Sequence, residues 1–198
     1  MKTHVLVVLL ALLCHASVRA VTLVPAPPGI NADAYLLMDF VTGEVLVEHN
    51  IDTRLPPASL TKLMTSYILA EEVDAGRLSL DDEVTVSRNA WSQNPQFRGS
   101  SLMWIEPGKK VTVGELEQGI VISSGNDATV AIAEHIAGSE EAFVALMNSY
   151  AEELGLTATH FENTHGLPNS DHLTTARDLG ALASATIRDH PDRYRVYR

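Results

Sequence analysis

The sequence predicts an α+β fold in which an antiparallel sheet packs with helices. Residues 34–40 and 44–49 have the composition of strands, and Thr42 and Gly43 between them are typical of a tight hairpin turn. Most of the later chain shows helical periodicity or helix caps. The chain has 198 residues, of which 45% are apolar and 20% charged, so it is long and apolar enough for one core.

The first twenty residues have the pattern of a secretory signal peptide. Residues 5–13 form an apolar run that is too short to span a membrane, and Val18-Arg19-Ala20 fits cleavage after Ala20. We therefore expect residues 1–20 to be a signal peptide, residues 21–30 a proline-rich lead-in and residues 31–198 the folded domain. The alternative is a buried N-terminal helix. A lipoprotein signal at Cys14 is disfavoured, because Leu13 is larger than the small residue usual before such a cysteine.

Charge and cysteine content exclude several classes of function. Removal of residues 1–20 leaves 12 basic and 25 acidic side chains, a formal charge of −13, which disfavours nucleic acid or anionic lipid as the main partner. Cys14 is the only cysteine and would be removed with the signal peptide. The exported chain would then have no disulfide, no cysteine-ligated zinc and no cysteine nucleophile.

The elements after the hairpin are predicted from the residues that start and stop helices and strands. A helix is expected from Ser59, after two prolines, with Gly76 as its stop. Residues 78–86 suggest a loop and a short strand, whereas 89–108 have no clean period and are a candidate lid or binding wall. A capping-box pattern runs from Thr112 to Glu115. Further helices are expected over residues 116–122, 128–137, 140–154 and 174–189, with residues 157–173 irregular.

The stretch with the clearest candidate catalytic residues is Ser59-Leu-Thr-Lys62. On a helix, residues i and i+3 share a face, so the Ser59 hydroxyl and the Lys62 amine can meet. A serine needs an adjacent base to become a nucleophile, and a lysine with a lowered pKa can be that base. The helix N-terminus also gives Ser59 a backbone N–H that could face an oxyanion. The ordinary alternative is a helix start followed by a solvated lysine.

A second constellation, Ser124-Gly-Asn126, lies between two expected helices. The hydroxyl could relay a proton to a leaving nitrogen, and the carboxamide could orient a lysine and accept a substrate amide. Taken alone, this tripeptide is typical of an ordinary capped turn.

Together the two motifs resemble the active-site serine penicillin-recognising enzymes, and in particular low-molecular-mass penicillin-binding proteins that act as serine D-alanyl-D-alanine carboxypeptidases. The likeness runs from about residue 30 to the C-terminus. The segments that carry it are Ala34-Tyr-Leu-Leu-Met-Asp-Phe, Pro57-Ala-Ser-Leu-Thr-Lys-Leu-Met-Thr, Ser124-Gly-Asn-Asp-Ala, Thr164-His-Gly-Leu and Thr175-Ala-Arg-Asp.

The resemblance implies a role for each site residue. Ser59 would be the nucleophile and contribute half of the oxyanion hole, and Lys62 the base for acylation. Ser124 would pass a proton to the departing D-alanine nitrogen. Asn126 would hold Lys62 and the substrate amide. His165 and Gly166 would bind substrate at the rim of the cleft, although His165 has no assignable chemical step, and a structural role for it stays open.

The chain departs from the family in one motif. The family has a Lys-Thr-Gly triad on a strand beside the active site, about a hundred residues after Ser-Gly-Asn, and no such tripeptide occurs here. We therefore expect a partial β-lactamase/transpeptidase-like domain that lacks its C-terminal sheet strands and membrane anchor. Such a chain is expected to be poorly folded and nearly inactive alone; cooperative unfolding and turnover of a D-Ala-D-Ala peptide by residues 21–198 would contradict this.

The implied function is removal of the terminal D-alanine from peptidoglycan stem peptides ending in D-Ala-D-Ala, with β-lactam antibiotics as covalent inhibitors. No metal or organic cofactor is implied. The site would lie in the periplasm or at the outer face of the bacterial cytoplasmic membrane, and membrane contact would need the absent anchor. Alternatives are a D,D-endopeptidase, a class A β-lactamase, which Glu162-Asn-Thr-His fits poorly, and a non-catalytic penicillin- or cell-wall-peptide-binding module.

Overall fold

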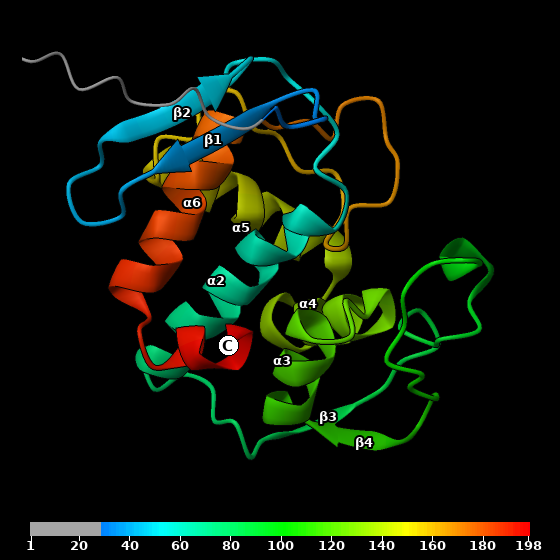
Figure 1. Ribbon diagram of the computed structural model, residues 1–198. Coiled ribbons are helices and arrows are strands. Elements are labelled where there is room, and N and C mark those ends of the chain that lie inside the picture. The colour runs from blue at the N-terminus through cyan, green and yellow to red at the C-terminus, as the bar shows by residue number, and fades with distance from the viewer. Residues whose placement is uncertain (1–28) are drawn as a thin grey trace, which may run out of the picture. The chain divides into compact units, whose positions relative to one another are not determined.

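The computed structural model describes residues 29–198, so the expected signal peptide and most of the lead-in lie outside the described residues. Residues 32–198 form a compact unit. Within it, five α-helices, three short 3₁₀ helices and two small antiparallel sheets make an α+β fold (Figure 1). The predicted fold class is therefore confirmed.

The first sheet is the predicted hairpin. Strand β1 (Tyr35–Met38) pairs with β2 (Val45–His49), and the register shifts after Leu37. The turn is closed by the Asp39 carboxylate, which accepts hydrogen bonds from the backbone N–H groups of Val41 at 3.0 Å and Thr42 at 2.7 Å. One face of β1 packs against helix α6 (Ala176–Asp189), where the Leu36 side chain lies over Gly180 (Figure 1). Leu37 of β1 and Val45 and Leu46 of β2 are exposed.

Helix α2 (Lys62–Asp74) is the central element of the unit. It contacts four other helices: α3 (Val113–Val121), α4 (Asn126–Ala137), α5 (Glu140–Glu153) and α6. Its buried side chains enter both apolar clusters, one with α3 and α4 through Leu69 and one with α5 and α6 through Met64 and Ile68. A helix that is buried on most of its faces gives its first turn a rigid support.

The start of this helix differs from the prediction. Residues Ala58–Thr61 form the 3₁₀ turn η1, and the α-helix begins only at Lys62. Pro56 and Pro57 prevent an earlier helical start, and Ala58 adopts a left-handed φ of 49°. Leu60 N–H donates to the Pro57 carbonyl at 3.1 Å, which tightens the turn.

The predicted capping box is present in the structure, and other helix ends are capped as well. Thr112 and Glu115 form the reciprocal capping box of α3, with the Thr112 N–H 2.8 Å from the Glu115 carboxylate. Ser139 caps α5 and Thr175 caps α6, each by accepting a backbone N–H three residues on. Gly138 ends α4 at a φ of 83°.

The second sheet was only half predicted. The expected short strand is β3 (Glu83–Thr85), but its antiparallel partner β4 (Lys110–Thr112) was missed. Two helix starts also correct the prediction: α3 begins at Val113, directly after its cap, and α4 begins at Asn126, two residues early. The 3₁₀ turn η2 (Pro95–Phe97) lies in a stretch expected to be irregular, and η3 (Arg193–Tyr197) follows the last expected helix.

None of the helices formed by residues 29–198 combines the length and apolarity needed to cross a membrane.

Candidate active site

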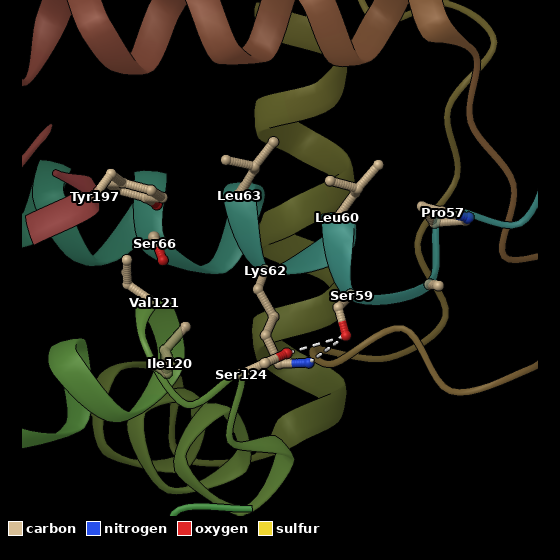
Figure 2. A pocket seen from close by; sticks show the side chains of 11 residues that line it. Pro57, Ser59, Leu60, Lys62, Leu63, Ser66, Ile120, Val121, Ser124 and Tyr197 are labelled. Carbon is tan, nitrogen blue, oxygen red and sulfur yellow. Dashed lines mark hydrogen bonds between the residues drawn. The ribbon is translucent and has the colours of Figure 1, made fainter. Parts of the chain in front are cut away.

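Three polar side chains from two separate segments meet at the start of α2 (Figure 2). The Lys62 amine lies 3.4 Å from the Ser59 hydroxyl oxygen, as the i, i+3 spacing predicts. From the connection between α3 and α4, the Ser124 hydroxyl donates to the same Ser59 oxygen at 3.1 Å. Ser59 is exposed, so its oxygen is accessible while two hydrogen-bonding groups approach it from within the protein.

Lys62 is 5% exposed and is held by two strong acceptors. Its Nζ donates to Asn126 Oδ1 at 2.6 Å and to the backbone carbonyl of His165 at 2.8 Å. Burial lowers the pKa of Lys62 to about 8, and the nearby Asp127 carboxylate acts in the opposite direction. Near neutral pH, a useful fraction of this amine is therefore unprotonated and able to take a proton from Ser59.

The Ser124–Asn126 connection owes its shape to one unusual backbone conformation and one close approach. Ser124 adopts a left-handed φ of 53°, which is uncommon for a residue with a side chain. Gly125 lies so close to the 101–105 segment that a Cβ there would be 2.9 Å from the Met103 nitrogen. The connection can therefore place the Ser124 hydroxyl and the Asn126 carboxamide on the same side only with glycine between them.

The loop with His165 and Gly166 supports η1 from the other side. Gly166 has a φ of 90°, and a Cβ at this position would overlap the Ala58 carbonyl group and lie 2.8 Å from Thr61 Oγ1. The close approach brings the His165 carbonyl to Lys62. The loop thus contacts the residues that flank Ser59, and it does so through its backbone.

The His165 side chain points away from the reacting groups. Its ring is buried against Phe97 at a centroid distance of 5.8 Å, its Nδ1 accepts the Leu167 N–H at 3.1 Å, and its Nε2 lies 3.6 Å from the Glu140 carboxylate. Burial lowers the pKa of His165 to about 3, so the ring is neutral. The expectation that this side chain lines the rim of the cleft is corrected: the ring is 6% exposed, and it is the carbonyl that reaches the site.

Two further features near the site were not predicted from the sequence. His172 Nε2 lies 2.7 Å from the Oγ1 atom of Thr61, and Thr61 lies between Ser59 and Lys62 in the sequence. Asp127 is fully buried, and its carboxylate accepts backbone N–H bonds from Met103, Trp104 and Ile105. The only sequence signal for Asp127 was its place in the Ser124-Gly-Asn-Asp-Ala segment.

A cavity of about 600 Å³ opens beside these groups (Figure 2). Its lining is mostly apolar and follows η1 and the start of α2, from Pro57 to Ser66, and it also includes Ile120, Val121 and Tyr197. Ser59, Lys62 and Ser124 are the polar groups at one end. Within residues 29–198, no group of three or more His, Cys, Asp or Glu side chains is placed to hold a metal ion. The arrangement is suited to acyl transfer, because a hydroxyl, a buried amine and a second hydroxyl converge next to an accessible cavity.

A family model for D-alanyl-D-alanine carboxypeptidases, peptidase family S11, matches residues 21–198. The chain belongs to this family. The resemblance read from the motifs is thereby confirmed.

Curated members of the S11 family include close relatives. D-alanyl-D-alanine carboxypeptidase DacC of Escherichia coli (strain K12) is 47% identical over 172 residues, which are 86% of this chain and 43% of the relative. DacA of the same strain is 48% identical over 178 residues, 89% of this chain and 44% of the relative. The chain thus spans less than half the length of these relatives.

Solved structures of penicillin-binding proteins share the fold. Penicillin binding protein 5 from Haemophilus influenzae superposes with a TM-score of 0.84 at 40% identity, covering 87% of this chain and 50% of that one. Penicillin binding protein 6B from Escherichia coli gives a TM-score of 0.83 at 45% identity, covering 90% and 56%. The unit is therefore part of a penicillin-binding, transpeptidase-type fold, as the sequence predicted.

Proposed function

We propose that the protein is a serine D-Ala-D-Ala carboxypeptidase that removes the terminal D-alanine from peptidoglycan stem pentapeptides and binds penicillin. The observation that carries this is the convergence of the Lys62 amine and the Ser124 hydroxyl on the Ser59 oxygen, at 3.4 Å and 3.1 Å. Membership of a D-alanyl-D-alanine carboxypeptidase family supports it.

In the acylation step, neutral Lys62 takes the proton from Ser59 as its oxygen attacks the carbonyl carbon of the penultimate D-alanine. The negative charge that develops on the carbonyl oxygen faces the Ser59 N–H. As the peptide C–N bond breaks, Ser124 gives its proton to the leaving nitrogen and regains one from Lys62. The products are free D-alanine and an ester between the shortened peptide and Ser59.

In the second step, water hydrolyses the ester. Lys62, again neutral, takes a proton from the water, whose oxygen attacks the ester carbonyl. The proton returns to the Ser59 oxygen as the tetrapeptide leaves with a new carboxyl group, which then ionises in solution. A penicillin would acylate Ser59 by opening its own strained amide. Because that leaving nitrogen stays tethered, the acyl-enzyme would be hydrolysed slowly.

Asn126, His165 and Gly166 complete the proposal. Asn126 holds the Lys62 amine and offers its carboxamide to the substrate amide. For His165 and Gly166, we propose that any contribution to substrate binding is indirect, because their backbone supports Lys62 and Ala58.

Export remains part of the proposal and rests on the sequence. Residues 1–20 would act as a signal peptide, and residues 31–198 would belong to a catalytic domain at the periplasmic or outer face of the cytoplasmic membrane. No ligand other than the stem peptide or a β-lactam is needed for the proposed chemistry.

Mass spectrometry after incubation with a penicillin tests the proposal. We expect a penicilloyl adduct that maps to Ser59 and is absent from Ser59→Ala, whereas Ser170→Ala, which changes an exposed serine, keeps the adduct. A folded wild-type protein without an adduct would contradict acyl-enzyme formation and favour a non-catalytic binding module. Release of D-alanine from a pentapeptide, compared with cleavage of a cross-linked dimer, separates a carboxypeptidase from an endopeptidase.

A further inference from the structure

Asp127 directly follows Asn126 in the first turn of α4, and its side chain is fully buried. Each of its carboxylate oxygens accepts two backbone N–H bonds. Oδ1 accepts from Met103 at 2.8 Å and Ala128 at 3.0 Å, and Oδ2 accepts from Trp104 at 2.8 Å and Ile105 at 3.1 Å. Because a backbone N–H can only donate, four such bonds require both oxygens to be acceptors, as in an ionised carboxylate.

These bonds join two segments that are irregular by themselves. Three consecutive N–H groups of the 101–105 segment point at one carboxylate, and Trp104 adopts a left-handed φ of 69° to allow this. The Asn126 N–H donates back to the Ser101 carbonyl at 2.9 Å. The segment and the Ser124–Asn126 connection are therefore fixed to each other by contacts in both directions.

The connection fixed in this way carries two groups of the candidate site. Ser124 donates to Ser59, and Asn126 accepts from Lys62, both through side chains at most three residues from Asp127. A shift of this connection would move both groups together. Misplacement of a reacting group by about 1 Å can lower a rate by about 100-fold.

Asp127 is also the charged neighbour of Lys62. Asp127 directly follows Asn126, whose Oδ1 lies 2.6 Å from the Lys62 amine, and its carboxylate acts on the pKa of Lys62, whereas the ring of the neighbouring His165 is neutral. Burial lowers the pKa of Lys62, and the negative charge of Asp127 opposes this effect.

We propose that Asp127 is a positioning residue for acyl transfer at Ser59: it locks the Ser124–Asn126 connection onto the 101–105 segment and places a buried negative charge directly after Asn126, whose carboxamide holds the Lys62 amine. The positioning half of this inference rests on the function proposed above. Its charge half concerns only the ionisation of Lys62 and holds whether or not the protein turns over a substrate.

The chain offers a matched control in Asp178. This aspartate lies in the first turn of α6, is 5% exposed and also ties a neighbouring loop to its helix. Its Oδ2 accepts from the Ala158 N–H at 3.0 Å and from Thr159 Oγ1 at 2.7 Å. Asp178→Asn therefore removes a comparable buried charge and comparable loop contacts, away from Lys62.

The charge half is tested by NMR titration of the lysine side chains, of which the chain has four. In the wild type we expect Lys62 to titrate at about pH 8. Asp127→Asn should move this titration to lower pH, whereas Asp127→Glu, which keeps the charge, and Asp178→Asn should leave it in place. A folded Asp127→Asn protein with an unchanged Lys62 titration would overturn this half. The titration does not require activity, so it stays informative if Ser59 forms no adduct.

The positioning half is tested by the rate of penicillin acylation at pH 9, where Lys62 is mostly neutral. We expect Asp127→Glu to acylate roughly 10- to 100-fold more slowly than the wild type, because the longer side chain cannot keep all four N–H bonds. Asp178→Asn should stay within about twofold. If Asp127→Asn does not fold, Asp127→Glu decides alone, and a rate within about twofold of wild type would overturn the positioning role.

Discussion

The Nζ atom of Lys62 and the Oδ1 atom of Asn126 lie 2.6 Å apart, although 64 positions separate the two residues in the chain. A carboxamide holds the amine in place without adding a negative charge beside it. This leaves burial as the main influence on Lys62, whose pKa falls to about 8. An asparagine at position 126 therefore holds the Lys62 amine without favouring its protonated form.

The first prediction follows from this contact. In the wild type, the rate of penicillin acylation should rise with pH through about pH 8, because the neutral form of Lys62 increases. Asn126→Asp places a carboxylate against the amine, which favours the charged form and raises its pKa by about 1–3 units. The acid limb of the rate profile should move to higher pH, and the rate at pH 7 should fall by about tenfold or more.

Acylation rates measured from pH 6 to pH 10 check this prediction. Asn94→Asp is a suitable control, because Asn94 is a carboxamide that caps η2, and the variant adds the same charge away from Lys62. An unmoved midpoint in Asn126→Asp would mean that this contact does not govern the ionisation of Lys62.

The second prediction concerns the close approach of Gly166 to η1. In Gly166→Ala the new methyl group would overlap the Ala58 carbonyl, so the loop or the turn before Ser59 must move. We expect a loss of roughly 2–4 kcal/mol in the free energy of unfolding and at least about tenfold slower acylation.

Gly155→Ala is the matched control for Gly166→Ala. Both glycines have a left-handed φ, 71° and 90°, but a Cβ at Gly155 would have no heavy atom within 4 Å. Gly155→Ala should therefore lose only the backbone cost of about 1 kcal/mol and keep its acylation rate. Thermal unfolding and penicillin acylation of both variants distinguish the two effects, and equal behaviour of the pair would show that the overlap is relieved without consequence.

The sequence could predict the parts of the site that are local. The Ser59–Lys62 approach follows from i, i+3 geometry even though a 3₁₀ turn replaces the first α-helical turn. The meeting of Ser124 with Ser59 spans 65 positions and was available only through the family resemblance. The bonds to Asp127 were not predictable, because their donors are backbone N–H groups of a segment without regular structure, which no side-chain pattern encodes.

The fold follows the same division. Helices with strong caps, such as Ser139 at α5, were placed to within about a residue, because a cap is a local signal. Strand β4 was missed because three residues, Lys110–Thr112, are too few for a period-2 pattern, and only their pairing with β3 makes them a strand. Helix α4 starts early because the Asn126 backbone is already helical while its side chain serves the site.

The last prediction concerns stability at acid pH and the buried His172 beside the active-site turn. His172 Nδ1 accepts the Glu162 N–H at 2.9 Å, so in the neutral ring Nε2 carries the hydrogen that is donated to Thr61 Oγ1 at 2.7 Å. Burial lowers the pKa of His172 from 6.5 to about 4. Between these two pH values, the unfolded chain binds a proton that the native protein does not bind.

The contribution of His172 to the free energy of unfolding should therefore be fully present above pH 6.5. It should fall by on the order of 2–3 kcal/mol as the pH drops toward 4. His165 acts in the same direction, because its pKa is lowered to about 3. Unfolding of the wild type at acid pH should therefore take up as many as two protons through these two rings. Urea unfolding at several pH values should show a shallower pH dependence in His172→Gln and an unchanged one in His135→Gln, whose ring is exposed. A full wild-type slope in His172→Gln would show that the proton taken up on unfolding belongs to another group.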